Sequence, residues 1–152
     1  MSNTVFFSFF YFFSATNIFG CYESGICKVS LLSRSGKFVA VEKNNKVNTN
    51  RGAVASDSIW EVNFVGDPKN NLVSFKGSNG RYMIAYNNGK IECTAKRVSR
   101  WEEFTVEDTG NGTFTIKSHH KQYVVAEDGA FKSKRDIEVA DAEAFLVRQV
   151  GK

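Results

Sequence analysis

A pattern of 13 residues recurs three times in this chain and limits the folds open to it. The copies cover residues 29–41, 73–85 and 114–126. When the aromatic residues Phe38, Tyr82 and Tyr123 are aligned, apolar residues fall in register at alternate positions before and after them. The aligned sets are Val29, Val73 and Phe114; Leu31, Phe75 and Ile116; and Ala40, Ile84 and Val125. Alternation with a period of two is typical of β-strands that bury one face.

The spacing of the copies predicts the fold. The aligned aromatic residues are separated by about 40 to 45 residues, a period at which self-similarity indicates a closed or stacked repeat architecture. The chain has room for three copies and no fourth. A β-propeller has a similar period but needs about four to eight blades. We therefore expect an all-β protein, a β-trefoil in which three four-stranded repeats form a barrel with pseudo-threefold symmetry.

A single domain accounts for the repeats. The chain has 152 residues, and its repeat region is within the size at which one core buries enough surface to fold alone. We assign residues 26–150 to one trefoil domain. The fourth strand of each repeat is expected at residues 59–64, 101–106 and 144–147. The inward-facing set is expected to include the aligned aromatic residues as well as the aliphatic ones.

Residues 1–20 form an apolar extension ahead of the repeats. Its phenylalanine-rich run, residues 5–13, is too short to span a bilayer. The run resembles the apolar core of a secretory signal, but no Lys or Arg precedes it and no A-x-A-like cleavage motif follows soon after. Three interpretations stay open: an uncleaved or poorly cleaved signal, a first strand with an apolar tail, and a segment foreign to the domain. The change in composition after Cys21 favours a position outside the trefoil.

The sequence does not indicate catalysis or metal binding. No loop combines a nucleophile, a base and an orienting group, and no glycine-rich strand-to-helix phosphate loop is present. His119 and His120 are adjacent without metal-ligand spacing to Cys, Asp or Glu, and we expect them in a turn. The 3 cysteines do not describe a disulfide framework, and Cys93 is expected on a strand. We expect neither an enzyme nor a cofactor.

Basic residues provide the one functional signal of this chain, whose net charge is +4. Two clusters are expected between the third and fourth strands of the second and third repeats, where a trefoil places equivalent loops at one end of the barrel. Arg51 begins the equivalent loop of the first repeat. We predict that the clusters form a positive face for an acidic filament or for phosphates. The candidate residues are Lys96, Arg97, Arg100, Lys132, Lys134 and Arg135.

The alternative is a solvated polar rim without a partner. Acidic residues follow the second cluster directly, at Asp136, Glu138 and Asp141. Interspersed charges of both signs weaken the case for a purely electrostatic binding face. The sequence alone leaves both interpretations open.

Several short motifs in the repeats resemble those of one known family. They are Lys46-Val47-Asn48 followed by Ile59-Trp60, the turns that end in Lys37-Phe38 and Arg81-Tyr82, and Gly89-Lys90-Ile91-Glu92-Cys93. Together they resemble the fascin family of actin-bundling β-trefoils, and residues 117–123 are similar to hisactophilin-like single trefoils. The resemblance implies a cytoplasmic, cytoskeletal protein that binds actin filaments, with cross-linking left open. It implies no nucleic-acid partner and no membrane span.

Two departures from the family pattern matter. Fascins carry four trefoils in one chain and this chain has one, and the lysine-rich stretch before Ile59 is replaced by Ala55-Ser56-Asp57-Ser58. Two other classes therefore stay open. One is a carbohydrate-binding trefoil, although the Gln-x-Trp triplet of ricin-type lectins is absent. The other is a secreted or structural interaction domain, favoured if residues 1–20 act as a signal peptide. The oligomeric state is not indicated.

Overall fold

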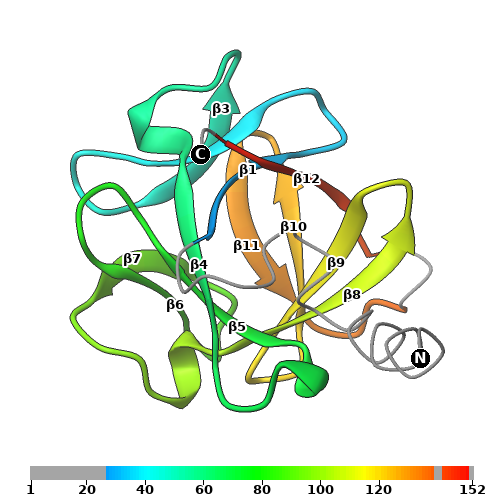
Figure 1. The fold of residues 1–152 in the computed structure, drawn as a ribbon. Coiled ribbons are helices and arrows are strands. Elements are labelled where there is room, and N and C mark those ends of the chain that lie inside the picture. Colours follow the sequence, from blue (N-terminus) through cyan, green and yellow to red (C-terminus); the bar gives the residue numbers. More distant parts are fainter. Residues whose placement is uncertain (1–26, 139–141, 151–152) are drawn as a thin grey trace, which may run out of the picture.

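The computed structural model describes residues 27–138 and 142–150, so the extension at residues 1–20 lies outside the described residues. The described part is all-β with three single-turn 3-10 helices (Figure 1). The strands are β1 Cys27–Leu32, β2 Phe38–Val41, β3 Val47–Arg51, β4 Trp60–Phe64, β5 Leu72–Lys76, β6 Tyr82–Ala85, β7 Ile91–Ala95, β8 Phe104–Gly110, β9 Thr113–Ser118, β10 Tyr123–Glu127, β11 Ala130–Lys134 and β12 Phe145–Gln149. The 3-10 helices are η1 Ser56–Ser58, η2 Pro68–Asn70 and η3 Arg100–Glu102. No helix of this part is long and apolar enough to cross a membrane.

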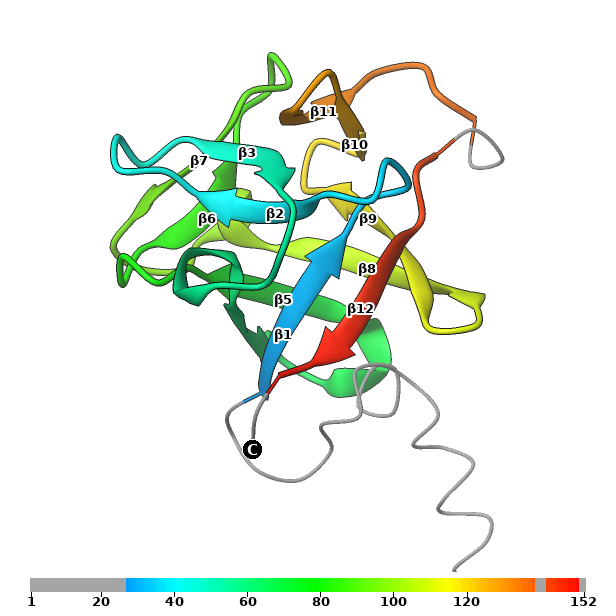
Figure 2. The same ribbon diagram turned by 90° about the horizontal axis from the view of Figure 1, so that it is seen from above.

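Six strands close into a barrel. In the order β1, β4, β5, β8, β9 and β12, each strand pairs antiparallel with the next, and β12 returns to β1. The other six strands form the hairpins β2–β3, β6–β7 and β10–β11, which lie together beside the barrel (Figure 2). Each repeat thus contributes two barrel strands and one cap hairpin. The predicted β-trefoil is confirmed.

The three cap hairpins are tied to one another in a closed cycle. Each hairpin tip accepts a backbone hydrogen bond from the third strand of the following repeat. The bonds are Cys93 N–H to Asn45 O at 2.8 Å, Ser133 N–H to Gly89 O at 2.9 Å, and Thr49 N–H to Gly129 O at 2.7 Å. Thr49, Cys93 and Ser133 are therefore equivalent positions of the three repeats.

Gly89 is required at its tip by both conformation and space. Its φ is +96°, in the left-handed region that favours glycine. A Cβ atom there would lie 2.6 Å from the carbonyl oxygen of Ser133, the strand residue that is hydrogen-bonded to the tip. The Gly89-Lys90 motif seen in the sequence therefore reports a close approach between the second and third repeats.

The barrel core confirms most of the predicted inward residues. The aligned aliphatic and aromatic residues of β1, β5 and β9 are at most 1% exposed: Val29, Leu31, Val73, Phe75, Phe114 and Ile116. Two aromatic contacts tie the core together, Phe75 with Phe104 and Phe131 with Phe145, each with ring centroids 5.6 Å apart. The repeats therefore share one core.

The aligned aromatic residues themselves were predicted on the wrong face. Phe38, Tyr82 and Tyr123 are half-buried, whereas the residues that follow them, Val39, Met83 and Val124, are 0% exposed. Successive side chains of a strand point to opposite faces, so the inward face of the second strands begins one residue later. The outward rings of Tyr82 and Tyr123 instead meet lysine: the Nζ atoms of Lys76 and Lys117 lie 5.7 and 5.0 Å from their centroids.

The fourth strand of the second repeat also starts later than expected. It begins at Phe104, and Trp101 lies in η3. Trp60, Phe104 and Phe145, the equivalent first residues of β4, β8 and β12, are 0% exposed, whereas Trp101 is 41% exposed.

Two 3-10 turns set this register. Buried side chains hold them: Ser58 Oγ accepts from Ala55 N–H at 2.9 Å, and Glu102 Oε1 accepts from Ser99 N–H at 2.6 Å. The alignment of Ser58 with Glu102 makes Trp101 the equivalent of Asp57.

Candidate functional site

The loop between β7 and η3 carries open positive charge. Lys96, Arg97 and Arg100 are all exposed. None of the three forms an ion pair with another described residue. Their charges are therefore available to an acidic partner without first breaking a contact inside the described part of the protein.

The third repeat does not present the predicted equivalent cluster. Because Ser133 is the equivalent of Cys93, Lys132 and Lys134 lie on β11 itself rather than in the loop after it. Both pair with Glu127 of β10, at 3.4 and 2.6 Å, and the hydrogen bond from Lys134 lowers the pKa of that carboxylate. The prediction that the two clusters occupy corresponding loops is wrong for these two lysines.

Arg135 is the one basic residue of this set that follows β11. It is exposed, and its Nη2 donates to the backbone carbonyl of Asn87 at 3.3 Å. Asn87 belongs to the turn between β6 and β7. Arg135 thus extends toward the second repeat, and its formal charge is not neutralised by that carbonyl contact.

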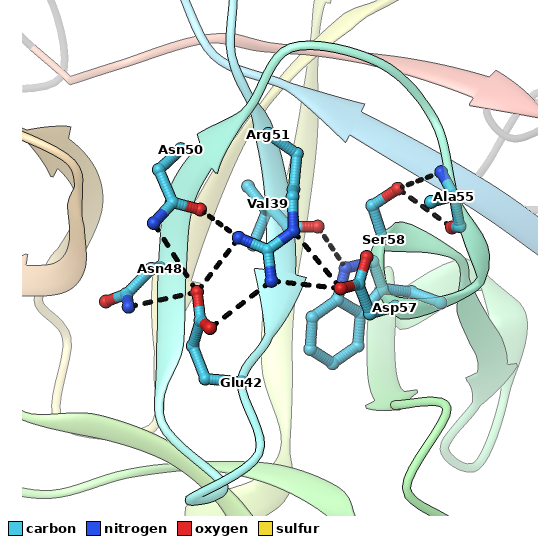
Figure 3. Close-up of polar contacts among 9 residues, drawn as sticks. Val39, Glu42, Asn48, Asn50, Arg51, Ala55, Asp57 and Ser58 are labelled. Atoms are coloured by element: carbon cyan, nitrogen blue, oxygen red, sulfur yellow. Dashed lines mark hydrogen bonds and ion pairs between the residues drawn. The ribbon is translucent and has the colours of Figure 1, made fainter.

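Arg51 is the centre of a separate polar network (Figure 3). It ends β3 and donates from Nη1 to Glu42 Oε2 at 3.1 Å and from Nη2 to Asp57 Oδ2 at 2.9 Å. Asn48 and Asn50 also donate to Glu42, at 3.2 and 3.4 Å. These bonds raise the pKa of Arg51 and lower the pKa of Glu42. The network links the β2–β3 hairpin to η1 and neutralises the arginine that the sequence placed with the basic face.

A surface pocket of about 650 Å³ opens beside this network. Five of its lining residues belong to the network, and Ser78 and Asn79 from a turn of the second repeat lie on its other side. Its lining is Val41, Glu42, Lys43, Asn44, Asn45, Asn48, Asn50, Arg51, Asp57, Ser78 and Asn79. Two carboxylates balance two cations in this lining, while the amides offer both donors and acceptors. The lining thus offers hydrogen-bond donors and acceptors without a net formal charge.

An aromatic cluster occupies the equivalent place in the second repeat. Tyr86 is the equivalent of Glu42, because the backbone N–H of each donates a hydrogen bond across its hairpin tip. Trp101 is the equivalent of Asp57. The rings of Tyr86 and Trp101 meet edge to face with centroids 5.8 Å apart, and Trp101 meets His120 at 4.9 Å. An aromatic contact thus joins hairpin to 3-10 helix where the first repeat uses ion pairs.

Sequence reasoning missed this cluster by assigning Trp101 to a core strand. The cluster would have become apparent if Trp60 had been aligned with Phe104 instead of with Trp101. His119 and His120 lie in a turn, as predicted. Within residues 27–138 and 142–150, no group of three or more His, Cys, Asp or Glu side chains is arranged to hold a metal ion. Cys93 is fully buried, and burial raises the pKa of its thiol to about 11.

These observations define a β-trefoil with a cationic loop, a polar pocket and an exposed aromatic cluster on its surface. The model of the Fascin domain matches residues 34–147. That match covers most of the chain, and the protein therefore belongs to the fascin family.

One solved structure places the fold among known trefoils. The structure described as "SeviL bound to asialo-GM1 saccharide" is similar to this chain with a TM-score of 0.69 and 14% sequence identity, covering 83% of this chain and 99% of that chain. At this level of identity the likeness concerns the fold alone. A search of curated proteins returned no match.

Proposed function

We propose that this protein binds actin filaments through the loop that carries Lys96, Arg97 and Arg100. Membership of the fascin family motivates the choice of partner. The observation that supports the choice of surface is the exposure of three cations that have no ion pair among the described residues. Clustered cations favour the approach of an acidic filament and speed its encounter with the protein.

The other basic residues are weaker contacts for physical reasons. Lys132 and Lys134 share Glu127, and Arg51 is held between two carboxylates. A filament carboxylate would have to compete with these internal partners. Arg135 keeps its charge, and its contact with Asn87 orients it toward the second repeat. It is the one residue of the predicted third-repeat cluster that we retain in the proposed surface.

Cross-linking is a separate activity. It needs two filament sites on one particle, because a bundle forms only when both are engaged simultaneously. The proposed loop supplies one site per trefoil. Binding without bundling is therefore our expectation for the isolated chain, and bundling would require self-association. Low-speed sedimentation, which pellets bundles but not single filaments, separates the two activities.

The full-length protein should pellet with actin filaments at high centrifugal speed. Binding should weaken as the ionic strength rises above about 0.1 M, where charges more than about 10 Å apart are largely screened. A parallel spin without filaments measures self-aggregation of the chain. Protein that stays in the supernatant at low salt with filaments in excess would contradict the proposed function.

A second candidate function is the binding of a neutral saccharide in the pocket beside Arg51. Two observations favour it: the balanced, amide-rich lining of that pocket, and the saccharide bound to a trefoil of similar fold. Unlike the filament, a neutral sugar would be held by hydrogen bonds rather than by net charge. The two candidates therefore differ in their response to salt.

Binding to immobilised neutral glycans tests this second candidate. It should be insensitive to salt, and Asn48→Ala should weaken it about five- to tenfold, the effect of losing roughly one hydrogen bond. The matched control is Asn70→Ala, which removes an exposed amide from η2, outside the pocket lining. Unchanged binding by the Asn48 variant would exclude this pocket as the site.

A further inference from the structure

An exposed aromatic surface lies next to the basic loop. We call it the Trp101 face and define it by Ile84, Tyr86, Arg100, Trp101 and His120. Ile84, Arg100 and Trp101 line one surface pocket of about 480 Å³. Trp101 is 41% exposed, and among the described residues only Val54, at 43%, is a large apolar residue of similar exposure. An exposed indole beside an arginine is the composition that protein interfaces favour.

The structural role of Trp101 does not require an exposed indole. In the first repeat Asp57 occupies the equivalent position and joins η1 to the hairpin through Arg51, without presenting apolar surface. The second repeat achieves the same connection through Trp101 and Tyr86. A smaller or polar residue would therefore satisfy the fold here. Large apolar surface left open at such a position is typical of an interaction site.

The indole is also held in place before any partner arrives. His120 packs against it at 4.9 Å, and the Nε2 of His120 donates to the carbonyl oxygen of Ala85 at 3.0 Å. On the other side Glu102 fixes the start of η3 through Ser99 N–H. A side chain ordered in this way loses little rotamer freedom on binding, which favours affinity.

The charges around the face select the chemistry of the partner. Two carboxylates near the face are engaged internally: Glu102 is 5% exposed and caps η3, and Glu92 pairs with Lys90 at 3.3 Å. A third, Glu103, is half-buried at the end of η3 and forms no ion pair with another described residue. Arg100 belongs both to this face and to the basic loop. Lys96, Arg97 and Arg100 outnumber Glu103, so the surface combines an apolar centre with net positive charge, and its complement is an apolar pocket bordered by carboxylates.

We propose that Trp101 is the anchor of the surface that contacts the filament, inserting into an apolar pocket on an acidic protein partner. The inference rests on the proposed function and adds a division of roles to it. Lys96, Arg97 and Arg100 steer the encounter, while Trp101 supplies the short-range contact that keeps the complex together. Interface energy concentrates in a few buried residues, with tryptophan and arginine enriched among them.

High-speed sedimentation of the full-length Trp101→Ala variant with actin filaments tests the inference. The dissociation constant should rise about thirtyfold or more, as expected for an interface anchor. The salt dependence of the remaining binding should equal that of the wild type, because no charge is removed. The matched control is Val54→Ala, which truncates a side chain of similar exposure in the loop before η1 and should bind as the wild type does.

Comparing Trp101→Ala with the wild type distinguishes failure of the anchor from failure of the proposed function. Wild-type affinity in Trp101→Ala, while the wild type itself pellets, overturns the anchor and leaves filament binding standing. Absence of wild-type pelleting overturns both. If Trp101→Ala loses cooperative unfolding, Trp101→Phe takes its place: it keeps a ring against Tyr86 and His120, and unchanged affinity in that variant overturns the inference. A Trp101→Ala variant that loses glycan binding but keeps its affinity for filaments would also overturn the inference.

Discussion

Replacing Phe75 with alanine should lower the free energy of unfolding by about 3 to 5 kcal/mol, the range for large-to-small changes in a packed core. The side chain is 0% exposed and packs edge to face on Phe104, with ring centroids 5.6 Å apart. Its strand, β5, pairs with both β4 and β8, so the cavity would open between three barrel strands. Urea denaturation followed by circular dichroism measures the loss.

Phe38→Ala is the matched control for this prediction. It removes the same side chain from a half-buried, outward position, and we expect a clearly smaller loss of stability. A loss below about 1 kcal/mol for Phe75→Ala, well under the range for core truncations, would contradict the assignment of the inward face. Equal losses for the two variants would contradict the distinction between the faces.

Reversing Lys96, Arg97 and Arg100 to glutamate should abolish filament binding. The change replaces attraction to an acidic filament by repulsion at the proposed contact. Thermal stability should stay close to that of the wild type, because the three side chains are exposed and exposed charges contribute little to the fold. Sedimentation with filaments and thermal unfolding, performed on the same preparation, test both parts.

The control is a second triple reversal, of Lys37, Lys132 and Lys134, which leaves Arg135 of the proposed surface unchanged. It changes the net charge by the same amount but removes two lysines already paired with Glu127. We expect it to weaken binding much less. Equal loss in the two triple variants would mean that the overall charge of the protein, and not the loop between β7 and η3, determines binding.

The repeat pattern was sufficient to predict the fold. Alternation of apolar residues is a local signal, and three copies in register require three equivalent β units that bury one face together. Val29, Val73 and Phe114 were placed in the core for this reason, and the structure confirms them. The turn at His119 and His120 followed from the same alignment.

The character of the surfaces depends on contacts between strands that are distant in the sequence. Whether a lysine is open or paired depends on the neighbouring strand: Glu127 lies on β10 and pairs with both Lys132 and Lys134 of β11. The pocket beside Arg51 likewise joins a hairpin, a 3-10 helix and a turn of the next repeat. A period of two along one strand carries no information about such contacts.

Trp101 illustrates the limit most clearly. In the sequence, Trp60 and Trp101 are each followed by a glutamate, and both were assigned to the fourth strand of their repeat. Buried polar caps, Ser58 and Glu102, shift the start of the fourth strand and align Trp101 with Asp57 instead. In both repeats the fourth strand begins two residues after the cap, at Trp60 and at Phe104, so Trp101 stays on the surface. The register of a strand decides which face each side chain takes.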